Sequence, residues 1–323
     1  MLSTRLTQAF NLIHPIIQAP MAMAAGGALA AAVTRAGGLG LIGGGYGDEA
    51  WIDEQFKEAG NENVGCGLIT WALAKNPAIL DLVLEHAPKA VFLSFGDPAP
   101  FASQIKARGI PLICQIQNLK DARRAIEIGA DVIVAQGTEA GGHGDARRTT
   151  FTLVPEVADL IAATSPDTLL CAAGGIADGR GLAASLMLGA DGVLVGSRFW
   201  ATTESLAHPN MIQEAMKATG DDSIRSSVMD IARKLNWPER YTARVLRNAF
   251  TDRWHSDVEG LLAAAEEESA RWKAAWIAGD VTTANTFVGE VTGLLNSVEP
   301  AAQILDTMAS DAEALMNKHR SIG

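Results

Sequence analysis

The sequence predicts a parallel (β/α)8 barrel, the TIM-barrel fold, with a smaller helical subdomain inserted near the C-terminus. Short apolar runs, most of them rich in β-branched residues, recur about every 20 to 35 residues, and helix-like patterns lie between them. The chain of 323 residues is long enough for one large barrel or for two ordinary domains. A doubly wound parallel sheet is the alternative that the same alternation allows.

Each apolar run has the pattern of a buried strand. The runs cover residues 15–19, 38–42, 64–70, 90–96, 110–116, 131–137, 168–174 and 192–199. Helical patterns in the connecting segments include residues 28–35, 48–59, 118–128 and 179–188. Because strand and helix alternate eight times, we expect a closed parallel barrel.

The character of the chain changes after residue 199. Residues 209–278 carry long polar and charged helical segments with several tryptophans and no convincing strand. We therefore expect a barrel over residues 1–205, a helical subdomain over 206–280, and a final segment, 281–323, that packs back on the barrel. A basic cluster in the subdomain has the spacing of a solvated helix face, which we favour over a phosphate-binding patch; it comprises Arg233, Lys234, Arg240, Arg244 and Arg247.

Charge and cysteine usage narrow the classes of function. The 26 Lys and Arg against 37 Asp and Glu give a net charge of −11, the wrong sign for a protein that tracks nucleic acid or binds an anionic membrane. Cys66, Cys114 and Cys171 lie far apart in apolar runs, which indicates reduced core thiols in a cytoplasmic protein without a metal-ligand set. Prolines and polar residues interrupt the uncharged stretch between Arg5 and Arg35, so it fits neither a signal peptide nor a membrane span.

The reactive groups of such a barrel lie in the loops that follow its strands. The loop 136–144 follows the sixth strand and presents His143 between glycines, where an imidazole can act as a base or a hydrogen-bond donor near neutral pH. A structural loop histidine explains the same pattern equally well. Tyr46, in the glycine turn 43–47 after the second strand, is placed to face a ligand.

Glycine is abundant, and its distribution indicates a phosphate site. Of the 32 glycines, 18 lie within residues 37–47, 137–144 and 174–196. The loops 173–180 and 195–199 follow the seventh and eighth strands, where barrels commonly bind phosphate through backbone N–H groups. A phosphate site combined with few catalytic side chains suggests that a cofactor carries the reaction, and flavin mononucleotide (FMN) fits.

Four segments resemble the nitronate monooxygenase family, formerly called 2-nitropropane dioxygenases. They are residues 14–21, 36–46, 136–144 and 196–199, and the resemblance spans the whole chain. It implies an FMN-containing barrel that oxidises alkyl nitronates with O2 to a carbonyl compound and nitrite, and it allows nitroalkanes as further substrates. The wider superfamily includes an FMN-dependent enoyl-acyl-carrier-protein reductase and an NADH:quinone reductase. The alternative is therefore an NAD(P)H-dependent FMN reductase of enoyl thioesters or quinones. Small molecules are the expected partners, and a homodimer is also allowed.

The resemblance also implies roles for individual residues. His143 would contact the substrate, as the base for neutral nitroalkanes or as a donor to the nitronate oxygens, and Tyr46 would also contact it. The isoalloxazine ring would lie along Ala19, Pro20 and Met21, with Gln115 and Gln136 at its polar edge or at the ribityl chain. The remaining cofactor contacts would come from Gly141 and Gly142 and, at the phosphate, from Ala173, Gly174, Gly175, Gly196 and Ser197.

Three positions depart from the family pattern. Gly67 stands where the superfamily often has an asparagine that meets the flavin. Ser197 replaces the usual threonine and should keep its hydroxyl. Glu290 stands where relatives often have glutamine.

Overall fold

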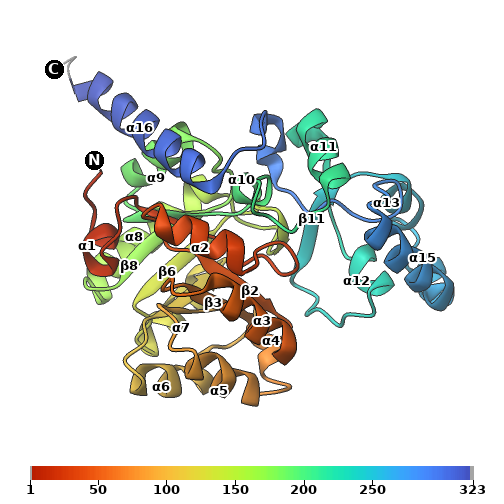
Figure 1. Ribbon diagram of the computed structural model, residues 1–323, viewed down its shortest axis with the longest axis horizontal. Coiled ribbons are helices and arrows are strands. Elements are labelled where there is room, and N and C mark those ends of the chain that lie inside the picture. Colours follow the sequence, from red (N-terminus) through yellow and green to blue (C-terminus); the bar gives the residue numbers. More distant parts are fainter. Residues whose placement is uncertain (1, 321–323) are drawn as a thin grey trace.

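The structure is a computed structural model that describes residues 2–320, and it confirms the predicted barrel (Figure 1). Its strands are β1 (Ile16–Gln18), β2 (Leu41–Gly45), β3 (Gly65–Ile69), β4 (Val91–Ser94), β5 (Leu112–Ile116), β6 (Val132–Gln136), β8 (Leu169–Ala173) and β9 (Gly192–Val195). They pair in parallel in the order β1-β9-β8-β6-β5-β4-β3-β2. The ring closes where Ile17 pairs with Leu39, just before β2.

Helices cover the outside of the barrel and connect its strands (Figure 1). Asp48, Asn118 and Asp178 begin three of them, each accepting a hydrogen bond from a first-turn backbone N–H. The helices are α2 (Gly27–Arg35), α3 (Glu49–Ala59), α4 (Thr70–Leu73), α5 (Ala78–Glu85), α6 (Ala99–Ala107), α7 (Leu119–Glu127), α8 (Thr150–Thr164), α9 (Gly179–Met187) and α10 (Ser197–Trp200). The last helix, α16 (Ala301–Arg320), packs against α9 and α2.

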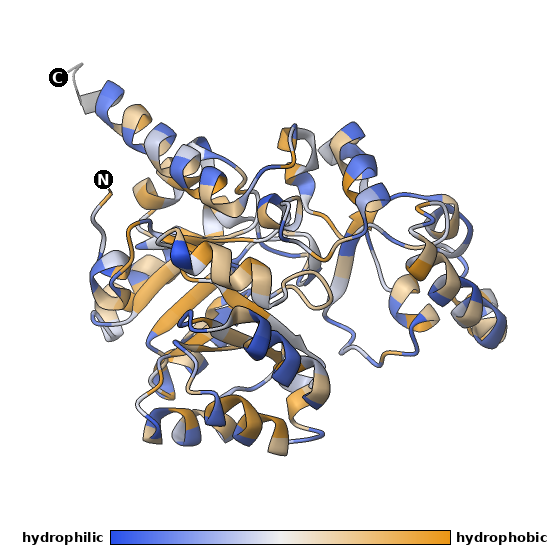
Figure 2. Ribbon diagram, in the orientation of Figure 1, coloured by the Kyte–Doolittle hydropathy of each residue, from blue (hydrophilic) through white to orange (hydrophobic). Residues whose placement is uncertain are grey.

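The strands are apolar and buried on both faces, whereas the surrounding helices alternate polar and apolar residues (Figure 2). One set of strand side chains fills the barrel interior and includes Ile17, Phe92 and Leu194. Leu6 and Phe10, from α1 (Arg5–Phe10), join this cluster. Since Arg5 of this helix bonds the carbonyl oxygens of Pro166 and Thr168, just before β8, α1 closes the amino-terminal end of the barrel.

A second body, which we call the cap (residues 206–295), lies beside the barrel, at the right of Figure 1. Its helical elements are α11 (Pro209–Lys217), η1 (Gly220–Asp222), α12 (Val228–Ala232), α13 (Ala249–Trp254), α14 (Val258–Ala263), α15 (Ala265–Ala278) and η2 (Glu290–Leu294). It also holds β10 (Ser223–Ser226) and β11 (Thr242–Leu246). Both belong to an antiparallel sheet of order β10-β11-β7, whose third strand is β7 (Gly142–Gly144) in the loop after β6.

The expectation that residues 209–278 contain no strand is therefore wrong. Strand β11 pairs with β7, in a barrel loop far earlier in the sequence. Short-range periodicity therefore could not reveal the pairing. The boundaries expected at residues 205 and 280 stay predictions. Ala284, Val288 and Leu295 pack in the cap's own apolar cluster, whereas Ala301 and Leu305 pack with the barrel. Residues 321–323 of the expected final segment lie outside the described residues.

Two strand ends also differ from the prediction. Strand β2 begins at Leu41 and includes Gly43–Gly45, which were expected to form a turn. Glycine is needed there because a Cβ at Gly43 would lie 2.4 Å from the carbonyl oxygen of Met21. Strand β9 ends at Val195, and the residues expected to continue it form the helical turn α10.

Within residues 2–320, no helix combines the length and apolar character that crossing a bilayer requires.

Candidate functional site

A large cavity opens at the carboxyl ends of the barrel strands, between the barrel and the cap. It encloses about 1430 Å³ between atoms, including the part that opens to solvent. All of the residues expected to form the site line this one cavity: Ala19, Pro20, Met21, Tyr46, Gln115, Gln136, Gly141, Gly142, His143, Ala173, Gly174, Gly175, Gly196 and Ser197. Their roles remain predictions. The cap also lines the cavity, which the sequence did not indicate. Its lining residues include Met211, Arg233, Trp237, Trp276, Phe287 and Val291.

The loops after β8 and β9 present backbone donors to the cavity. Gly174 (φ +99°) and Gly175 (φ +72°) adopt left-handed conformations that suit glycine. Their N–H groups, and those of Gly196 and Ser197, donate to no acceptor in the part of the chain that the structure describes. Ser197 Oγ accepts a hydrogen bond from Gly289 N (2.9 Å), which leaves its own proton available. Four free donors converging from two loops fit the phosphate of a flavin nucleotide.

Hydrogen-bonded side-chain amides link the carboxyl ends of β5 and β6. Gln115 Nε2 and Gln117 Nε2 both donate to Gln136 Oε1, at 3.2 and 2.9 Å. Gln136 Nε2 in turn donates to the carbonyl oxygen of His143 (3.2 Å). Gln136 is therefore committed on both sides of its amide, and the carbonyl oxygen of Gln115 is the acceptor left for a ligand in the cavity.

His143 lies on β7 with its imidazole held on two sides. Its Nε2 lies 2.9 Å from Asp230 Oδ2 and 3.1 Å from Oδ1, and Trp237 stacks on the ring with centroids 3.5 Å apart and planes at 4°. The side chains of His143 and Asp230 are only 8% and 3% exposed. Burial lowers the pKa of His143 below its usual value, although Asp230 opposes this effect.

The Asp230 carboxylate can only accept a hydrogen bond, so the neutral imidazole carries its proton on Nε2. Nδ1 then has the free lone pair, as a general base requires. Sequence reasoning missed Asp230, which is 87 positions from His143 and supplied by α12 of the cap. The one available signal was an isolated acid within an apolar helical run.

Aromatic side chains surround this pair. Tyr46 follows β2, and its hydroxyl accepts a hydrogen bond from Trp237 Nε1 (3.1 Å). Phe95 follows β4 and packs edge-on against Trp237 and Tyr241, with centroids 5.2 Å away in each case. Its φ of +64° is unusual for a bulky residue and costs about 1 kcal/mol or more. Burial raises the pKa of Tyr46, which keeps its hydroxyl neutral.

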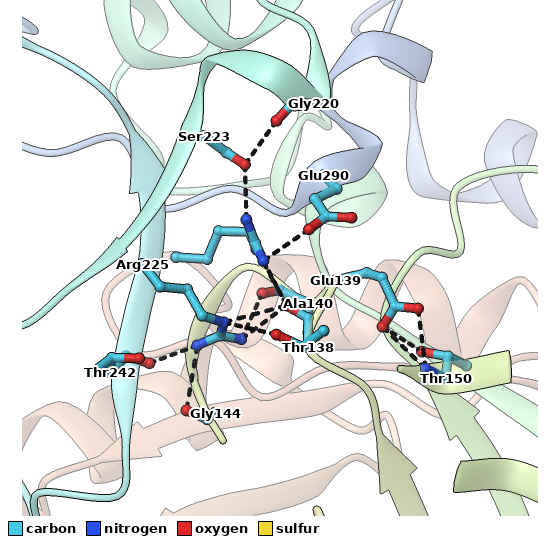
Figure 3. A network of polar contacts seen from close by, with 11 residues as sticks. Thr138, Glu139, Ala140, Gly144, Thr150, Gly220, Ser223, Arg225, Thr242 and Glu290 are labelled. Atoms are coloured by element: carbon cyan, nitrogen blue, oxygen red, sulfur yellow. Dashed lines mark hydrogen bonds and ion pairs between the residues drawn. The ribbon is translucent and has the colours of Figure 1, made fainter. Parts of the chain in front are cut away.

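Two arginines hold the loop that carries His143 (Figure 3). Arg225 and Arg244 both donate to the carbonyl oxygen of Thr138, each through Nη2 at 3.0 Å. Arg225 also donates to the carbonyl oxygens of Gly144 (3.2 Å) and Thr242 (2.7 Å). Burial, reinforced by the neighbouring Arg244, lowers the pKa of Arg225 to about 10, so it stays charged at neutral pH. We call Arg225 and Arg244 the arginine clamp.

The expectation that the basic cluster forms a solvated helix face is wrong, because none of its five members lies within a helix and two of them turn inward. Arg244 is on β11 and its guanidinium turns inward to Thr138 and to Glu290, whose Oε1 lies 2.7 Å from Nη2. Arg233 ends α12 and lines the cavity. The spacings of four and three positions from Arg240 to Arg244 to Arg247 have a helical period, but Arg244 lies on a strand, where that period does not indicate which side chains face solvent.

Gly67 on β3 lines the cavity beside Pro20. A Cβ at this position would lie 2.3 Å from both Cβ and Cγ of Pro20. The proline ring therefore occupies the space that an asparagine side chain would need.

Comparison with known proteins agrees with this architecture. The family model described as nitronate monooxygenase matches residues 3–65 and 66–311. A nitronate monooxygenase from Neurospora crassa is 32% identical, over 94% of this chain and 90% of its own length. FabK from Thermotoga maritima superposes with a TM-score of 0.86 at 30% identity, over 100% of both chains. A nitroalkane oxidase from Streptomyces ansochromogenes shares the fold, with a TM-score of 0.81 at 24% identity over 98% and 99% of the two chains. The chain belongs to the nitronate monooxygenase family, whose members are flavoenzymes.

Proposed function

We propose that this protein binds FMN and oxidises alkyl nitronates with O2 to a carbonyl compound and nitrite. The observation that carries the proposal is the buried His143–Asp230 pair, which shares a cavity with the donor-rich glycine loops in a chain of this family. FMN would supply the electron-accepting chemistry and the reaction with O2. The buried thiols of Cys66, Cys114 and Cys171 support a cytoplasmic location.

Several residues are suited to hold the cofactor. The free N–H groups of Gly174, Gly175, Gly196 and Ser197 would bind its phosphate, with no lysine or arginine required. Gln115 would offer its carbonyl oxygen to a donor on the cofactor. The strand end at Ala19, Pro20 and Met21 would provide an apolar surface for the ring, and Gly141 and Gly142 would allow its close approach.

His143 would have two different tasks with the two substrate forms. A nitronate is already a carbanion equivalent, so it needs no base, and the imidazole would orient it. A neutral nitroalkane must first lose a proton from carbon, and Nδ1 of His143 would accept it while Asp230 holds the Nε2 proton. Tyr46 and Trp237 would exclude water around this transfer.

The test is nitrite release from propyl nitronate under air, without any nicotinamide, by protein reconstituted with FMN. Stoichiometric nitrite and propanal support the proposal. Rapid NADH consumption with a quinone or an enoyl thioester, together with no nitrite, would instead establish the reductase alternative. A preparation that retains no flavin after reconstitution would contradict both.

A further inference from the structure

The cavity has one cationic side chain among its described lining residues, and that side chain is Arg233. The one carboxylate in the lining is Glu139, and it is occupied, because both its oxygens accept from Thr150 N at 3.0 Å and Oε2 also accepts from Thr150 Oγ1. An anion that enters the cavity therefore meets a single positive charge.

Arg233 is buried without a close partner for its charge. Its side chain is 12% exposed, and its nearest carboxylate oxygen, Asp230 Oδ1, lies 3.9 Å away, beyond hydrogen-bond distance. That carboxylate is already engaged by His143. The Tyr46 hydroxyl is its other polar neighbour, so a guanidinium with five N–H donors keeps several of them for a ligand.

Aromatic rings form the surroundings of this guanidinium. Its carbon lies 5.5 Å from the ring centroid of Tyr46, 5.8 Å from that of Trp272 and 5.7 Å from that of Phe287. These rings stabilise the cation and exclude water, so an anion that reaches it is attracted more strongly than it would be at the protein surface.

We propose that Arg233 binds the planar anionic group of the substrate and makes the site select nitronates over the neutral nitroalkanes of the same carbon skeleton. Naming the anion as a nitronate rests on the proposed function. A guanidinium can hold both oxygens of such a group in one plane. The neutral His143 offers no positive charge to the anion, and Asp230 would repel it, so Arg233 is the residue left for this task.

The cofactor phosphate is a weaker candidate for this guanidinium. Arg233 contacts Tyr46, which follows β2, whereas the free backbone donors follow β8 and β9. In the closed strand order, β1 lies between β2 and β9, so Arg233 contacts the end of a strand that is adjacent to neither donor strand. We therefore assign the phosphate to the backbone donors and Arg233 to the substrate.

The test uses an unreactive pair of ligands that differ in charge and match in shape. Butyrate has the planar two-oxygen anionic head of a nitronate, and butyramide is its neutral counterpart. Both are titrated calorimetrically into FMN-loaded wild-type protein and into Arg233→Gln, Arg233→Met and Arg253→Gln. Arg253 is the matched control, because it lies 4.2 Å over Trp254 and 3.5 Å from Glu268 but is outside the cavity.

We expect the wild-type protein to bind butyrate roughly 10- to 100-fold more tightly than butyramide. Both Arg233 variants should lose this preference, and Arg253→Gln should keep it. In turnover, Arg233→Gln should raise KM for propyl nitronate by a similar factor and leave KM for 1-nitropropane within about threefold.

Several results would overturn the proposal. Equal affinity of the wild-type protein for the two ligands would do so regardless of how the variants fold. A preference that survives in Arg233→Gln or Arg233→Met would do so as well. Release of FMN by these variants would also overturn it, because the guanidinium would then bind the cofactor and not the substrate. A butyrate preference that depends on Arg233 in a protein that makes no nitrite would leave this proposal standing and reject the proposed function.

Discussion

The barrel and the cap contribute to one cavity in different ways. The barrel offers mainly backbone, through the loops at Gly174, Gly175 and Gly196, whose N–H groups are free. The cap offers side chains with charge or large rings, such as Arg233 and Trp237, and it supplies Asp230, which pairs with His143. Backbone donors suit a constant phosphate, whereas side chains can change to suit a substrate. From this comparison we expect the barrel to bind the cofactor and the cap to decide what reacts with it.

The two regions meet at His143. The residue belongs to a barrel loop, yet its strand β7 pairs with β11 of the cap in register with Ala243. The arginine clamp adds hydrogen bonds from the cap to the same loop. A change in the cap is therefore expected to alter catalysis, and a change in the glycine loops to alter cofactor retention.

The largest expected effect comes from His143→Asn. The variant loses the base, so kcat/KM for a neutral nitroalkane should fall by roughly 10²- to 10⁴-fold, and that for the nitronate by less than about tenfold. Nitrite release from 1-nitropropane and from propyl nitronate measures the two losses. Equal losses on both substrates would remove His143 from the role of base.

Asp230→Asn should have the next largest effect, since the cap then no longer fixes the imidazole tautomer. We expect roughly 10- to 100-fold loss of kcat/KM on nitroalkanes. Asp230 raises the pKa of His143, so its removal lowers that pKa further. The acid limb of the pH profile, where activity falls as His143 is protonated, should therefore shift to lower pH. Asp252→Asn, at an exposed cap carboxylate paired with Arg247, is the control and should leave the profile unchanged.

Gly175→Ala tests the barrel side of the comparison against Gly60→Ala. The two glycines have φ of +72° and +66°, and neither has an atom within 3.5 Å of an added Cβ. Both variants should lose about 1–2 kcal/mol of stability from the left-handed backbone. Only Gly175→Ala should also weaken FMN binding, by about tenfold, because its methyl group enters the phosphate site. Thermal unfolding and flavin titration separate the two effects, and equal FMN affinity in both variants would argue against a phosphate at Gly175.

The smallest effect is expected from Glu290→Gln, which restores the residue that relatives often have. Glu290 is 41% exposed, and its ion pair with Arg244 should contribute less than about 1 kcal/mol. Arg244 keeps its hydrogen bonds to Thr138 and Ser223, so FMN affinity and turnover should not change. Arg244→Gln removes those bonds too and should lower the unfolding temperature measurably more. A large loss of activity in Glu290→Gln would mean that this carboxylate matters to the site.

Much of the barrel could be predicted because its evidence is local. Each buried strand is a continuous apolar run, and the loops at Gly174 and Gly196 follow two such runs directly. One exception within the barrel is β2, where Gly43–Gly45 were assigned to a turn. Their glycine content reflects close packing against Met21 and Ala22 within a strand, and composition alone cannot distinguish that packing from a turn.

The cap was predicted less well, because its order depends on partners far away in the sequence. Arg244 has a helical spacing from its neighbouring basic residues, but it lies on a strand that pairs with the His143 loop. Asp230 and Arg233 are separated by three positions on α12 and its end, and nothing in that spacing indicates that one meets a histidine 87 positions away and the other lines the cavity.

The sequence by itself determined the barrel, the family, the glycine loops and the position of His143 in the loop after the sixth strand, because apolar runs and glycine turns are short-range patterns. Only the tertiary structure decided which groups act on His143. The carboxylate at its Nε2, the indole on its face and the guanidinium of Arg233 nearby all come from the cap. The effect of these groups on His143 depends on burial and on separations of a few ångströms. Both arise only when the barrel and the cap pack together.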